Sequence, residues 1–254
     1  MTIEANNNPE EKVRAIYRRL AGSWGAQHWW PAETPFEVIV GAILTQNTSW
    51  KNVERALASL RAANALSIAG IRGLELPELE QLIRSSGYYR QKADRLKRFV
   101  SFLDERYGGS LKKMFAVPTE PLRGELLSLK GIGQETADAI LLYAGNHEIF
   151  VVDAYARRIL ARHAIVSEDA KYETIRTLVE RALHDEAVHA VAAPERPSKM
   201  QVHQPSPMSA SQRTPRTQTY NEMHGLFVQV GKHFCDKAQP RCEQCPLCPL
   251  LPPK

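Results

Sequence analysis

The chain has 254 residues, a hydrophobic share of 43%, a formal net charge of +5 and an isoelectric point near 9.0. This length and composition suit a globular protein with a buried core in one domain or in two closely packed domains. Because no apolar run reaches membrane length and the first residues lack a signal-peptide core, we expect a cytoplasmic protein without membrane association. The mild basic excess favours a polyanionic partner without proving one.

Apolar residues recur at helical spacing along most of the chain, and no stretch is a convincing sheet, which predicts an all-α fold. The predicted helices cover residues 10–20, 35–44, 50–63, 76–85, a long segment ending near Tyr107, segments around 122–129 and 137–144, and then 154–163, 172–183 and the stretch from Tyr220. Residues 187–217 are rich in Pro, Ser, Gln and Arg, so we predict a disordered linker there.

Two clusters, one aromatic and one polar, lie between the first predicted helices. Trp29 and Trp30 stand side by side before Pro31. They either fill the core, as Trp commonly does, or form an aromatic surface for stacking. Gln46 belongs to the polar run 45–48, which follows the apolar helix and could cap its C-terminus.

A tight turn, Lys130-Gly131-Ile132-Gly133, joins the helices around 122–129 and 137–144. Two glycines permit a turn that ordinary residues would resist. The amides at the start of the second helix then suit a phosphate, and Lys130 adds a positive charge. Asp153 follows a buried-looking run and opens the next helix, where it could also serve as the N-cap.

All four cysteines lie within the last twenty residues, in the pattern Cys235-x6-Cys242-x2-Cys245-x2-Cys248. Four thiols packed so closely in an intracellular chain indicate a metal site. The spacing alone fits either an iron–sulfur cubane or a tetrahedral zinc ion.

In their order along the chain, these motifs resemble those of the endonuclease III superfamily of helix-hairpin-helix DNA glycosylases. The resemblance covers residues 13–183 and 220–254. It implies two domains, a helical barrel at 34–145 with the hairpin at about 122–145, and a second domain from 10–33 plus 146–254 with the iron–sulfur loop at 235–248. The active cleft is expected between them.

The resemblance also assigns roles to single residues. The hairpin residues Lys130, Gly131 and Gly133 would grip the DNA backbone, and Gln46 would enter the gap left by a flipped nucleotide. Asp153 would serve the glycosidic bond. The partner is expected to be double-stranded DNA containing damaged bases, bound by a monomer.

The superfamily carries a [4Fe–4S] cluster on four C-terminal cysteines. Cys235, Cys242 and Cys245 match its usual spacing, whereas Cys248 comes earlier than the family pattern has it. The resemblance favours iron–sulfur over zinc, with a structural role for the cluster.

Strand-cleaving members of the superfamily have a Lys two residues after the second hairpin glycine, where it forms a Schiff base. This chain has Glu135 there, which predicts a monofunctional, water-using glycosylase, although Glu135 could equally be an ordinary exposed helix residue. A carboxylate with aromatic walls also suits a cationic base. The motifs WWP, ILTQNTS, KGIGQETADAILLYA and FVVDAY most resemble the 3-methyladenine glycosylases, in which residues like Trp29 and Trp30 line the base pocket.

We therefore expect hydrolysis of the N-glycosidic bond of alkylated purines in base excision repair. Two alternatives remain. One is an endonuclease III-like glycosylase for damaged or mismatched pyrimidines. The other is a non-catalytic, DNA-binding iron–sulfur protein.

Overall fold

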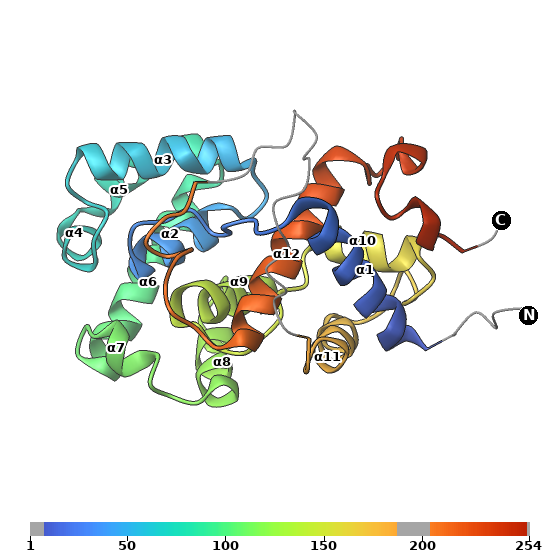
Figure 1. Ribbon diagram of the computed structural model, residues 1–254. Coiled ribbons are helices and arrows are strands. Elements are labelled where there is room, and N and C mark those ends of the chain that lie inside the picture. The colour runs from blue at the N-terminus through green and yellow to red at the C-terminus, as the bar shows by residue number, and fades with distance from the viewer. Residues whose placement is uncertain (1–7, 187–203, 253–254) are drawn as a thin grey trace, which may run out of the picture. The chain divides into compact units, whose positions relative to one another are not determined.

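The computed structural model describes residues 8–186 and 204–252, and every regular element in these ranges is a helix (Figure 1). The all-α prediction is confirmed. Within the same ranges, no helix is long and apolar enough to cross a membrane. The chain divides into two compact units, one formed by Ala32–His147 and the other by the residues up to Pro31 together with those from Glu148 onwards.

The unit formed by Ala32–His147 is built around α2, Pro35–Leu44, in which every residue after Pro35 is buried. The helix starts sharply because Pro35 occupies its first turn and the Thr34 hydroxyl accepts a hydrogen bond from the Glu37 amide at 3.1 Å. Helix α2 packs against α3 (Trp50–Ala62), α6 (Tyr89–Tyr107) and α9 (Gln134–Ala139). Helices α4 (Ile68–Gly73), α5 (Leu76–Leu82) and α7 (Leu111–Met114) pack against α6, and α8 (Thr119–Ser128) packs against α9. A 3-10 turn at Arg84–Ser86 precedes α6, and α9 continues as a π-helix at Ile140–Ala144.

The other unit contains α1 (Pro9–Trp24), α10 (Ala154–Arg162), α11 (Tyr172–Ala182) and α12 (Pro215–His233), followed by 3-10 turns at Cys242–Gln244 and Cys248–Leu250. Helix α12, drawn in orange, is buried over most of its length and packs against α10 and α1 (Figure 1). Gly231 allows this packing, because a Cβ there would lie 2.0 Å from a ring carbon of Tyr155.

The predicted linker at 187–217 is only partly covered, since its residues 187–203 lie outside the described residues. For residues 215–217 the prediction of disorder is wrong, because they belong to α12, and residues 204–214 contain a hydrogen-bonded turn. The hydroxyl of Ser206 accepts from the Ser209 amide at 3.1 Å, and α12 starts at Pro215 instead of Tyr220. The reason is local: the Thr214 hydroxyl accepts from the Thr217 amide at 3.1 Å, and Pro215 occupies the first turn.

Candidate functional site

The hairpin between α8 and α9 needs only one of its two glycines for backbone reasons. Gly131 has φ +92°, and a Cβ there would lie 2.3 Å from Nε of Arg95. Gly133, the N-cap of α9, has φ −95° and ψ 178°, and a Cβ there would meet nothing within 4 Å. The expectation that both glycines are required by the turn is therefore corrected: Gly131 makes the turn, and Gly133 leaves open space at the start of α9.

Gln46, two residues after the end of α2, holds this turn through hydrogen bonds. Its amide nitrogen donates to the Gly131 carbonyl at 3.1 Å and to the Thr136 hydroxyl at 2.8 Å, and its amide oxygen accepts from the Arg95 guanidinium. The Gln46 side chain thus forms hydrogen bonds on both sides of the hairpin. These partners lie in the hairpin and not in the helix that Gln46 follows.

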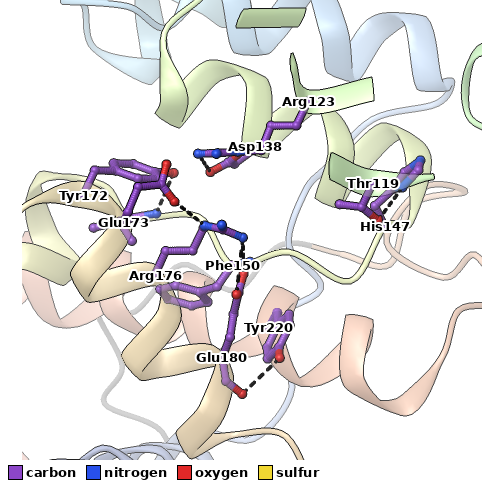
Figure 2. Close-up of polar contacts among 11 residues, drawn as sticks. Thr119, Arg123, Asp138, His147, Phe150, Tyr172, Glu173, Arg176, Glu180 and Tyr220 are labelled. Atoms are coloured by element: carbon purple, nitrogen blue, oxygen red, sulfur yellow. Dashed lines mark hydrogen bonds and ion pairs between the residues drawn. The ribbon is translucent and has the colours of Figure 1, made fainter. Parts of the chain in front are cut away.

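A buried ion pair ties the two hairpin helices together (Figure 2). Nε of Arg123 on α8 lies 2.6 Å from Oδ1 of Asp138 on α9, and a second guanidinium nitrogen lies 3.2 Å from Oδ2. Both side chains are almost fully buried. Lys130 and Glu135, by contrast, are exposed at the turn and in the first turn of α9.

A buried lysine at the start of α6 fixes the end of α2. Lys92 on α6 donates to the Leu44 carbonyl at 2.8 Å and to the Ser86 carbonyl at 2.6 Å. Its burial, assisted by the nearby charge of Arg95, lowers its pKa to about 8. Leu44 is the last residue of α2, so Lys92 holds the backbone from which Gln46 extends.

In the other unit, Asp153 is the N-cap of α10. Its Oδ1 accepts from the Ala156 amide at 2.7 Å, and its Oδ2 lies 3.5 Å from Nε2 of His224 on α12. The side chain is 12% exposed. The capping interpretation is confirmed, and the catalytic role stays a prediction.

Helix α11 holds the extended run that leads to Asp153 (Figure 2). The Phe150 amide donates to a carboxylate oxygen of Glu180 at 2.9 Å, and the Val152 amide donates to the Tyr172 hydroxyl at 3.2 Å. Arg176 donates to the same Glu180 oxygen at 3.2 Å and keeps it in place. These contacts fix the backbone immediately before the carboxylate.

The two tryptophans have different surroundings. Trp30 is 7% exposed and belongs to the core, whereas Trp29 is half-buried. The Trp29 ring meets the His224 ring edge-on, with centroids 6.2 Å apart, and the Lys232 ammonium lies 5.7 Å from its centroid. Because it is partly exposed, Trp29 is better placed than Trp30 to stack on another ring. The Lys232 ammonium already lies next to the Trp29 ring.

The four cysteines line one cavity. Its other walls come from apolar residues and two basic side chains: Ile159, Val230, Phe234, Leu247, Leu251, Arg162 and His163. Arg162 lies 3.1 Å from the Cys235 sulfur, and burial raises the pKa of the Cys245 thiol to about 11. Cys248 shares the cavity despite its early position. Over the described ranges, no three His, Cys, Asp or Glu side chains are grouped closely enough to bind one metal ion.

Residues 40–184 match the family described as HhH-GPD superfamily base excision DNA repair protein. The chain belongs to this superfamily. A Methanocaldococcus jannaschii protein, provisionally named a DNA repair glycosylase, is 40% identical over 242 residues, which cover 94% of this chain and 96% of that protein. The Thermotoga maritima endonuclease III is 26% identical over 83% of this chain and 79% of its own length.

Among solved structures, the HhH-GPD chain is similar to the 3-methyladenine DNA glycosylase of Helicobacter pylori bound to 1,N6-ethenoadenine. The TM-score is 0.69 at 27% identity, covering 89% of this chain and 97% of that one. The resemblance to the endonuclease III superfamily is confirmed by these matches.

Proposed function

We propose that this HhH-GPD protein is a monofunctional DNA glycosylase that releases alkylated purines, such as 3-methyladenine, from double-stranded DNA. The observation that carries the proposal is the likeness to the Helicobacter pylori 3-methyladenine glycosylase over 97% of that enzyme's chain. Membership of a base excision DNA repair superfamily supports base release from DNA as the type of reaction.

Asp153 is the proposed catalytic carboxylate. Breaking an N-glycosidic bond develops positive charge on the sugar, and a fixed negative charge beside it lowers the energy of that state. The carboxylate is largely buried, held through Oδ1 by the Ala156 amide, and carried on a backbone run that α11 clamps. It can therefore stabilise the developing charge and orient the attacking water without reorganising.

Glu135 replaces the lysine that a strand-cleaving member of the superfamily would use. A carboxylate cannot form an imine with the sugar, so the proposed reaction ends with free base and an intact strand. In this proposal Glu135 also favours cationic bases. Its exposure in the first turn of α9 leaves it accessible to DNA.

Trp29 is the proposed stacking surface for the extruded base, and Trp30 supports it from the core. The ammonium of Lys232 next to the Trp29 ring would oppose a cationic base stacked there. The hairpin would bind the DNA backbone through Lys130 and the start of α9 at Gly133, where a Cβ would meet nothing within 4 Å, while Gln46 would leave its bonds to the turn to fill the gap in the duplex.

We propose a [4Fe–4S] cluster on Cys235, Cys242, Cys245 and Cys248. All four thiols line one apolar cavity, which fits a thiolate-bound group, and the resemblance to the endonuclease III superfamily favours a cubane over zinc. When bound, the cluster would supply structural cross-linking of the C-terminal loop and no step of the reaction.

A panel of duplexes, each carrying one damaged base, tests the proposal. The monomeric protein should release free base from duplexes with alkylated purines and leave the strand uncut until alkali is added. Release confined to damaged or mismatched pyrimidines would favour the endonuclease III-like alternative, to which the 26% identical Thermotoga maritima enzyme points. Tight binding to every duplex without base release would indicate a non-catalytic DNA-binding protein.

A further inference from the structure

Helix α12 brings a histidine to the carboxylate of Asp153. His224 is 5% exposed, and its Nε2 lies 3.5 Å from Oδ2 of Asp153. The two residues are distant in the sequence, and His224 belongs to none of the motifs described above. Catalytic hydrogen bonds are often long before substrate binds, so this separation is compatible with a functional contact.

The two oxygens of Asp153 therefore face different partners. Oδ1 is fixed by the Ala156 amide at 2.7 Å, and Oδ2 faces the imidazole. The last torsion of an Asp side chain is broad, so a carboxylate held at one oxygen can still rotate about its terminal bond. A second partner at the other oxygen removes this freedom.

His224 is itself held firmly. Its ring meets Trp29 edge to face, with an interplanar angle of 68° and centroids 6.2 Å apart, a favourable aromatic geometry. The helix that carries it packs closely on α10, where Gly231 lies against the Tyr155 ring. The imidazole of His224 thus lies between the Asp153 carboxylate and the Trp29 ring and faces both.

We propose that His224 is a positioning residue, which fixes the orientation of the Asp153 carboxylate and joins it to Trp29. The inference rests on the proposed function, in which Asp153 acts on the glycosidic bond and Trp29 stacks on the base. Small misplacements of a reacting group cost rate strongly. Loss of His224 should therefore slow bond cleavage while leaving DNA binding, which depends mainly on phosphate contacts, nearly intact.

The kinetic test compares single-turnover base release by the full-length protein and its His224→Ala, His224→Gln, Asp153→Asn and double variants. We expect His224→Ala to lower the rate between about tenfold and a hundredfold, with affinity for lesion duplex unchanged. Gln can place an amide nitrogen near the position of Nε2 and should restore much of the rate. In the Asp153→Asn background, His224→Ala should cause no further loss.

Thr219→Val is the matched control, because Thr219 is a buried polar residue of α12 that bonds the Glu186 and Pro215 carbonyls and has no contact with Asp153. It should keep the parental rate. Equal losses from His224→Ala in both backgrounds, or a parental rate in His224→Ala, would overturn the proposal, since either result shows that His224 does not act through Asp153.

A second measurement separates this inference from the proposed function. Urea unfolding is compared for the parental protein, His224→Ala, Asp153→Asn and the double variant. If His224 contacts the Asp153 carboxylate, the loss of unfolding free energy caused by His224→Ala should be smaller in the Asp153→Asn background. Equal losses in the two backgrounds would refute the pairing. If the parental protein releases no base from any duplex, the proposed function fails, and this comparison still decides whether His224 holds Asp153.

Discussion

At Gly131 the backbone adopts φ +92°, and Arg95 lies where a side chain would project. Gly133, two residues later, has ordinary backbone angles and open space around it. The roles of the two hairpin glycines can therefore be tested separately. Substitution of Gly131 should affect protein stability, and substitution of Gly133 should affect ligand binding.

Gly131→Ala should destabilise the protein by about 1 kcal/mol or more, because it strains the turn and displaces Arg95 from Gln46. Gly133→Ala should keep the parental melting temperature yet weaken binding to all duplexes alike, since backbone phosphates carry no base information. Thermal unfolding and titration with undamaged and lesion duplexes measure both effects. Parental DNA affinity in Gly133→Ala would contradict the phosphate-binding role.

At the scale of elements, the buried pair Arg123–Asp138 joins α8 to α9. Arg123→Met should lower the free energy of unfolding by about 3–5 kcal/mol, because it leaves the Asp138 charge buried without its partner. The double variant Arg123→Met/Asp138→Leu should recover most of this loss. Arg106→Met removes the exposed pair with Glu125 and is the control, with stability nearly unchanged in urea unfolding. A small effect of Arg123→Met would show that the pair does not hold the hairpin.

The buried Lys92 links α6 to α2 and gives stability a pH dependence. Its pKa is about 8 in the folded protein against an ordinary value of 10.5. Between these values the unfolded chain binds more protons, so the free energy of unfolding should rise with pH, by at most about 1.4 kcal/mol per pH unit. Urea unfolding from about pH 7 to about pH 10 measures the slope. Lys92→Met should lose this contribution, and an identical slope in that variant would refute it.

How well the sequence predicts the bounds of a helix depends on where its proline and capping residues lie. Pro35–Leu44 could be bounded correctly, because Pro35 starts the helix and polar residues end it. The start of α12 was misplaced because its Thr214-Pro215 signal lies in a stretch whose composition resembles a linker. Contacts such as His224 with Asp153 could not be predicted, since the packing of α12 on α10 creates them.

At the scale of the whole molecule, the family and the all-α fold were accessible from the sequence, because the hairpin, the carboxylate and three of the four cysteines keep the spacing of the family. The proposed cofactor is testable without any activity. Purified protein should be yellow-brown with about four iron atoms per chain, and Cys248→Ala should lose colour and iron as Cys242→Ala does. Colourless protein with stoichiometric zinc would contradict the cluster, and an unchanged cluster in Cys248→Ala would exclude Cys248 as a ligand.

The most direct test of the proposed mechanism is the rate of base release by Asp153→Asn. Asn caps helices about as well as Asp, so the variant should keep the melting temperature and the affinity for lesion duplex of the parental protein. Removal of the negative charge beside the sugar should lower single-turnover release of alkylated purine by about a hundredfold or more. Release at the parental rate would show that Asp153 is only the cap of α10, and the glycosylase mechanism proposed for it would be wrong.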